Sequence, residues 1–128
     1  MNIREYFQKH QGFGVLATAD GEGRVNAAVY ATPHCFEDGT VGFVMPDRLT
    51  HSNLQANGHA TYLFREDAEA SARRYNGVRV YLKKVGEDDD PSRIDSLRRR
   101  TYGDDRDGRH LVLFAVEQTL QLVGPEPA

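Results

Sequence analysis

A cation and a hydroxyl lie two residues apart where a short helix is expected to begin. Arg48 and Thr50 follow Asp47, and the spacing of the residues over 48–57 predicts a helix. The first N–H groups of a helix have no partner within it, so with a cation and a hydroxyl beside them they can bind a phosphate. Alternatively, Asp47 and Thr50 only cap the helix and Arg48 is solvated. The residues alone favour this second interpretation.

A second candidate lies in the extended run RVNAAVYAT, over 24–32. Asn26 is disfavoured inside a strand, so its amide could bind a ligand, or could be satisfied by backbone at the rim of a barrel. Ala27 and Ala28 are small enough to let a planar group approach the backbone, although ordinary strand packing would also explain them. The residues leave these alternatives open.

The histidines and the single cysteine form no recognisable site in the sequence. His34 and Cys35 are adjacent, without a second ligand pair at metal-binding spacing. His51, His59 and His110 are scattered, with no spacing to a carboxylate or nucleophile that would indicate catalysis. We therefore predict no metal site, assign no catalytic residue, and interpret Cys35 as a small buried side chain.

Further cations have simpler explanations than ligand binding. Arg79 and Lys83 share the outward face of an alternating strand, where they could reach a phosphate but more often are solvated. The run at 98–100 is all arginine, but acidic residues at 87–90 and 104–105 nearly cancel its charge. We therefore predict no nucleic-acid binding.

The bulk composition is that of an ordinary globular chain. It has 128 residues, 39% hydrophobic and 27% charged, with a net charge of -3. This length predicts one domain over 1–128. The lone cysteine fits a reducing compartment, and no apolar run approaches the roughly 20 residues of a membrane span. We therefore expect a cytoplasmic protein that binds no membrane.

Turn residues and hydrophobic periodicity predict a mainly β fold. Short helices are expected at 2–11, 48–57 and 91–102, and strands at 13–19, 24–32, 40–45, 59–65, 78–85 and 110–123. The segments at 33–38 and 66–76 are predicted as loops. Short connections favour antiparallel pairing, so we expect a six- to seven-stranded antiparallel β-barrel with helices at its rim.

The region 13–64 resembles the pyridoxamine 5'-phosphate oxidase-like, FMN-binding split-barrel family. The resemblance is carried by GVLATADGEGRVNAAVYAT and VGFVMPDRLTHSNLQANGHATYLF, and the later FAVEQTLQL is similar to the closing strand of small flavin-binding members. It implies a flavin-dependent oxidoreductase or electron carrier that holds FMN at a homodimer interface and acts on an unknown small molecule or electron partner.

The resemblance also implies which residues hold the flavin. The phosphate falls at Arg48, Leu49 and Thr50, and the ribityl chain and ring fall along the second strand. The implied cofactor-binding residues are Val25, Asn26, Ala27, Ala28, Met45, Arg48, Leu49, Thr50 and Asn53.

Other functions remain open at this stage. A split barrel could bind another planar cofactor, such as heme or a deazaflavin, or could be a non-catalytic dimeric interaction module. We do not expect pyridoxamine-phosphate oxidase activity itself, because the C-terminal substrate-binding segment of those enzymes is not found in this sequence.

Overall fold

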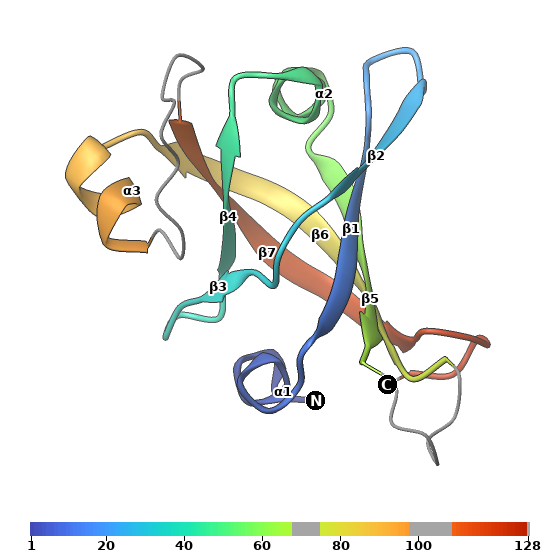
Figure 1. The fold of residues 1–128 in the computed structure, drawn as a ribbon. Helices are drawn as coiled ribbons and strands as arrows, with labels where there is room; N and C mark the ends of the chain where they lie inside the picture. The colour runs from blue at the N-terminus through green and yellow to red at the C-terminus, as the bar shows by residue number, and fades with distance from the viewer. Residues whose placement is uncertain (68–74, 98–108, 128) are drawn as a thin grey trace.

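A computed structural model describes residues 1–67, 75–97 and 109–127. Seven antiparallel strands form one sheet in the order β2-β1-β5-β6-β7-β4-β3, and three short helices accompany them (Figure 1). The elements in chain order are α1 (Ile3–Lys9), β1 (Gly12–Ala19), β2 (Val25–Val29), β3 (His34–Cys35), β4 (Val41–Pro46), α2 (Leu49–Ala56), β5 (His59–Glu66), β6 (Gly77–Asp88), α3 (Pro91–Leu97) and β7 (Arg109–Gln121).

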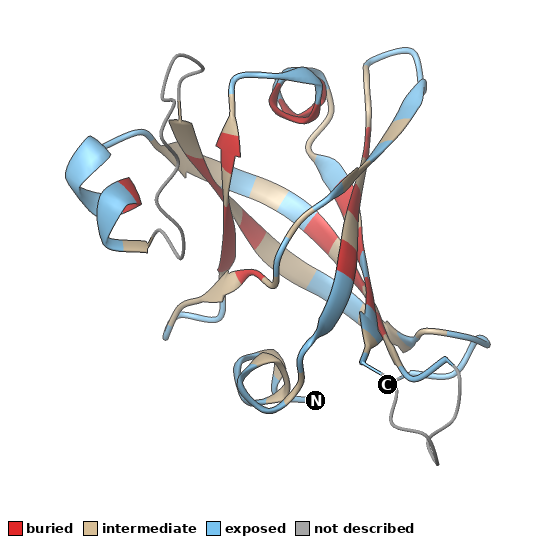
Figure 2. Ribbon diagram, in the orientation of Figure 1, coloured by how far each residue is buried: buried red, intermediate tan, exposed pale blue. Residues whose placement is uncertain are grey.

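The sheet curls into a split barrel, whose two edge strands are not paired with each other (Figure 1). Aromatic side chains fill the space between them: the Tyr30 ring lies 5.8 Å from Phe43, which in turn lies 5.1 Å from Tyr62. The buried residues, coloured red in Figure 2, form one hydrophobic core to which β1, β4, β5, β6, β7 and α2 all contribute. The mainly β, six- to seven-stranded antiparallel barrel predicted from the sequence is therefore confirmed.

The first hairpin forms because its turn satisfies its own backbone. The Asp20 carboxylate accepts hydrogen bonds of 2.9 Å from the backbone N–H groups of both Glu22 and Arg24. Gly23 has a φ of 83°, a left-handed conformation that glycine adopts without steric cost. The predicted hairpin is confirmed, with β1 and β2 in antiparallel register from Val15–Val29 to Ala19–Val25.

Two local predictions were wrong. The expected loop at 33–38 contains the short strand β3, which pairs with β4. Strand β6 runs past the predicted end at Val85 to Asp88, because a bulge between Lys84 and Gly86 lets it keep pairing with β7. The C-terminal run, for which one long strand or a pair of strands was expected, is one long strand, β7. The predicted loop at 66–76 and helix end at 98–102 lie largely outside the described residues.

Helix α1 closes the end of the barrel that lies away from α2 (Figure 1). The side chain of Asn2 caps it by accepting the Glu5 N–H at 3.1 Å. Phe7 packs edge-on against Phe64 at 5.2 Å. The Tyr6 hydroxyl donates a 2.7 Å hydrogen bond to the Glu66 carboxylate at the end of β5. Burial, and then the hydrogen bond and charge of Glu66, raise the pKa of Tyr6 well above its ordinary value of 10.0.

We expect Tyr6→Phe to cost about 1 kcal/mol of unfolding free energy near neutral pH, because one hydrogen bond is lost. A raised folded-state pKa contributes stability that is complete below the unfolded pKa and is lost as the pH rises above it. The advantage of the wild type should therefore be constant up to about pH 9 and shrink between about pH 10 and pH 12. Urea unfolding of both proteins across this range measures it; a constant difference would contradict the assignment.

Candidate functional site

Polar side chains gather where the N-terminus of α2 meets β2. Thr50 is buried in the first turn of α2, and the Asn26 amide lies 3.4 Å from its hydroxyl oxygen. One turn further along α2, the buried Asn53 amide donates a 3.1 Å hydrogen bond to the Thr18 hydroxyl. Thr18 and Asn26 are direct cross-strand partners in β1 and β2. The structure therefore brings three predicted residues, Asn26, Thr50 and Asn53, into one cluster.

Tyr30 joins this cluster, although the sequence analysis did not single it out. Its hydroxyl is hydrogen-bonded with Thr50, and its backbone carbonyl accepts a 2.9 Å hydrogen bond from the Tyr62 hydroxyl. Burial raises the pKa of Tyr30, while the Thr50 hydrogen bond and the charge of Arg48 act in the opposite direction. A period of two from Asn26 could have revealed it, because alternate residues of a strand share one face.

The other predicted residues divide between two surfaces and the core. Strand β2 alternates: Asn26 and Ala28 are partly covered, whereas Val25 and Ala27 face outward. Leu49 is exposed on the first turn of α2. Met45 is completely buried in the core, so its side chain supports the site from below rather than lining its surface.

Helix α2 has no side chain bonded to its first N–H groups. Arg48, not Asp47, is the N-cap residue, and no side-chain capping hydrogen bond forms. This corrects the expectation that Asp47 and Thr50 cap the helix. Because those amides are not satisfied by a cap, the N-terminus keeps its capacity to bind an anion.

Contacts on the opposite side of α2 hold it in place. The His51 ring nitrogen Nε2 lies 3.0 Å from the Glu87 carboxylate of β6, and Gln55 donates a hydrogen bond to the same carboxylate. Lys84 donates to it as well, at 2.8 Å. Burial would raise the pKa of Glu87, but these hydrogen bonds outweigh it and lower the pKa to about 2. The carboxylate is therefore charged at neutral pH.

The alternative cations do not approach this cluster among the residues that the structure describes. Arg79 donates to the backbone carbonyls of Gln121, at 2.8 Å, and of Gly124, so it fastens the end of β7. Lys83 lies beside Gly58, near the start of β5. The arginines at 98–100 lie outside the described residues.

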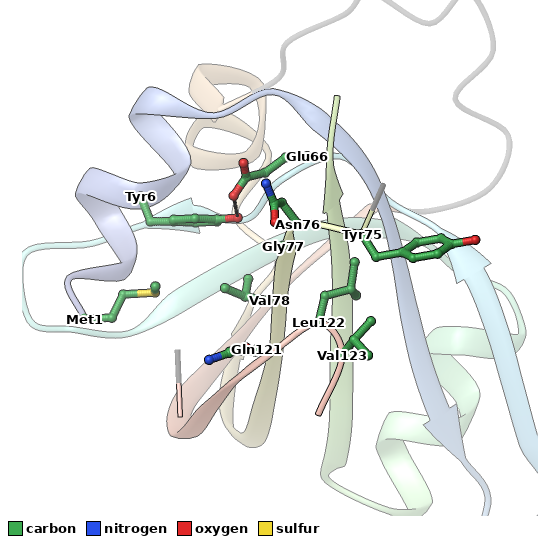
Figure 3. Close-up of a pocket in the computed structure, with 10 residues that line it drawn as sticks. All are labelled: Met1, Tyr6, Glu66, Tyr75, Asn76, Gly77, Val78, Gln121, Leu122 and Val123. Carbon is green, nitrogen blue, oxygen red and sulfur yellow. Dashed lines mark hydrogen bonds between the residues drawn. The ribbon is translucent and has the colours of Figure 1, made fainter. Parts of the chain in front are cut away.

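A separate open hollow of about 510 Å³ lies near α1, at the other end of the barrel (Figure 3). Tyr6 and Glu66 line one side, and Leu122 and Val123 line the other. None of the predicted cofactor residues reaches it. We therefore assign it no ligand.

Comparisons with known proteins show what this chain resembles. No family model matches the sequence, and no curated protein matches it. An FMN-binding protein from Syntrophomonas wolfei subsp. wolfei is 18% identical, with 98% of this chain and 86% of that chain covered and a TM-score of 0.77.

Two further solved structures have related folds. An F420 reductase is 18% identical, with 90% of this chain and 94% of that chain covered and a TM-score of 0.60. HutZ, the heme storage protein from Vibrio cholerae, is 18% identical, with 93% and 91% covered and a TM-score of 0.59. At this identity the likeness shows the fold, which confirms the split barrel expected from the sequence.

We expect Gly14→Ala to destabilise the protein by about 1–3 kcal/mol. A methyl group at Gly14 would overlap the Tyr62 hydroxyl, whose hydrogen bond holds the backbone of Tyr30. Urea unfolding measures the loss. Gly21→Ala is the matched control, because its new methyl would meet only Ala56, at 3.9 Å, and should change stability by less than about 0.5 kcal/mol. Equal effects at both positions would refute the packing argument.

Proposed function

We propose that this chain, a split barrel in fold, binds FMN beside the N-terminus of α2 and works in a homodimer as a flavin-dependent oxidoreductase or electron carrier. The strongest support is the gathering of four different donors at one helix end. They are the guanidinium of Arg48, the hydroxyls of Tyr30 and Thr50, and the amide of Asn26.

These groups fit the phosphate of FMN. A doubly charged phosphate needs a cation and several hydrogen-bond donors, and helix N–H groups without a side-chain cap add to the hydroxyls. The charge of Arg48 already acts on the Tyr30 hydroxyl, so the guanidinium lies within electrostatic range of the cluster. Leu49 would contribute its backbone N–H, and the buried Asn53 and Met45 would hold the helix and strand beneath.

Strand β2 fits the ribityl chain and the flat ring. Among the described strands β2 pairs only with β1, so its outer edge leaves backbone N–H and C=O groups available to a ligand. Flavin rings carry both donors and acceptors along one edge, which such a strand can match. The small side chains of Ala27 and Ala28 would let the ring approach, with Val25 and Asn26 at its end.

The outward face of the same strand supports a homodimer. Val25 and Val29 are 82% and 67% exposed, and Leu63 and Phe13 on the neighbouring strands are exposed as well. Because β2 and β1 pair in register, these side chains share one apolar sheet face. Exposed apolar patches of this kind mark interfaces, and a second copy would also cover a ring bound at the edge of β2.

The flavin would supply electron transfer, and the protein would bind, orient and shield it. The substrate and the reductant stay undetermined. Among the described residues no helix is long and apolar enough to cross a bilayer. A cytoplasmic location, a single domain over 1–128 and the absence of nucleic-acid binding remain predictions.

We expect Arg48→Ala to weaken FMN binding by about 10- to 100-fold, because a charge-assisted hydrogen bond contributes about 1.5–3 kcal/mol. Riboflavin lacks the phosphate, so its affinity should change little. Fluorescence titration of the wild type and the variant with both ligands measures this, and Arg4→Ala, on α1, serves as the charge-matched control. An equal loss for FMN and riboflavin would remove Arg48 from the phosphate site.

The absorbance of the purified protein separates the other candidate functions. Flavin bands support FMN, whereas a Soret band would indicate heme and a deazaflavin spectrum would indicate an F420-type cofactor. Proteins with this fold are described as FMN-binding, as an F420 reductase and as a heme storage protein. These spectra therefore cover the alternative cofactors. A colourless protein that takes up no FMN would favour an interaction module.

We expect Val29→Asp to weaken the homodimer by about tenfold or more, because the substitution places a charge in a buried apolar interface. Sedimentation velocity over a dilution series measures the dimer, and FMN affinity should fall with it. Val85→Asp is the matched control: Val85 is 58% exposed, at the bulge of β6 and outside this face. A monomeric wild type, or equal effects of the two variants, would contradict the interface.

A further inference from the structure

Two histidines distant in the sequence lie face to face on the side of α2 away from β2. The rings of His51, on α2, and His110, near the start of β7, are stacked at 3.7 Å with an angle of 9° between their planes. Both residues are largely buried, and carboxylates lie at both edges of the stack. In the sequence they are far apart and nothing there connects them.

A third possible metal ligand, Asp47, lies at one edge of the stack. The Asp47 carboxylate lies 3.5 Å from Nδ1 of His51 and 3.9 Å from Nε2 of His110. All three atoms lie within 4.8 Å of one another. We propose that Asp47, His51 and His110 bind a divalent transition-metal ion, in a site separate from the flavin site.

The other edge of the stack supplies the outer carboxylates that such sites use. Nε2 of His51 lies 3.0 Å from Glu87, and Nδ1 of His110 lies 3.0 Å from Asp89. A histidine that binds a metal through one nitrogen usually gives its other N–H to a carboxylate, which orients the ring and increases its basicity. His51 has this arrangement with Glu87, whereas Asp89 lies within reach of the outer nitrogen of His110 without an aligned hydrogen bond.

A bound metal ion would give His110 a partner that its ring nitrogens lack. Both of its ring nitrogens are buried, and neither has a hydrogen-bond partner in acceptable geometry, even with Asp89 nearby. A buried polar atom without a partner costs free energy. A metal at Nε2 would remove that cost directly, and it would fix the proton on Nδ1, where Asp89 can accept it.

The charges favour a cation at the Asp47 edge rather than at the Glu87 edge. Glu87 is already paired with the Lys84 ammonium, at 2.8 Å, which would repel a metal ion. Asp47 is 68% exposed, and within the described part of the chain it lies in ion-pair range of the two histidines. Its exposure also gives an ion a path from solvent to the two buried rings.

The donor set selects the class of metal. Two imidazoles and one carboxylate suit zinc, cobalt, nickel, copper or iron in the divalent state, whereas calcium and magnesium prefer oxygen ligands. Ligand atoms around a tetrahedral zinc ion lie about 3.4 Å apart, given bonds of about 2.0–2.1 Å. The Asp47 carboxylate, at 3.5 Å from His51 and 3.9 Å from His110, is already close to that spacing from each histidine. The two rings are nearly parallel, and a nitrogen lone pair lies in the plane of its ring. The rings would therefore have to tilt toward each other for both nitrogens to bind one ion.

The test uses the full chain without an affinity tag, stripped of metal with a chelator. We expect calorimetric titration with Zn²⁺ to show about one site per chain, and Co²⁺ to give visible absorption bands typical of low coordination with nitrogen ligands. Asp47→Asn should weaken Zn²⁺ binding by about tenfold or more and change the Co²⁺ spectrum.

His110→Ala should abolish the site, and Asp47→Asn guards against misfolding because it alters an exposed side chain. His59→Ala is the control, since His59 is exposed on β5 and lies by Glu117, away from the stack. Titrations with and without bound FMN separate this site from the flavin site. No Zn²⁺ binding, or equal affinity in Asp47→Asn, His59→Ala and the wild type, would overturn the proposal.

Discussion

Helix α2 lies across one end of the barrel, and the contacts on its two sides determine everything proposed for this protein. On one side Thr50 and Asn53 contact β2 and β1. On the other side His51 and Gln55 contact Glu87 of β6. A helix of eight residues is too short to be stable alone, so these tertiary contacts must hold it. Its N-terminus is consequently held rigidly beside β2.

The two faces of strand β2 differ, so the proposed ligand site and the proposed dimer interface lie on the same strand. Asn26 and Ala28 face the helix, whereas Val25 and Val29 present apolar side chains to solvent. As an edge strand, β2 also offers backbone groups along its free side. A ligand bound at that edge would lie next to the apolar face, so a second copy covering the face would shield the ligand as well.

The fold limits the range of candidate functions, but it does not identify the cofactor. Proteins with this fold are described as FMN-binding, as an F420 reductase and as a heme storage protein. Each of these ligands is large and planar, but only some carry a phosphate that a helix N-terminus can bind. FMN binding is therefore proposed because of Arg48, Thr50 and Tyr30 rather than because of the barrel fold. The stacked rings of His51 and His110, on the other side of α2, support the proposed metal site rather than flavin binding.

Local pattern was sufficient for most elements, including the Asp20 hairpin, the Asn2 cap and the helix at α2, because their causes lie within a few residues. The resemblance to the split-barrel family, rather than the pattern, implied Asn26 and Thr50 as site residues. The pattern could not reveal the passage of β6 beyond Val85 to Glu87, or the stacking of His51 on His110. Those depend on a bulge and on the pairing of β6 with β7. Strand register is decided by packing across the whole barrel, so only the tertiary structure brings those residues together.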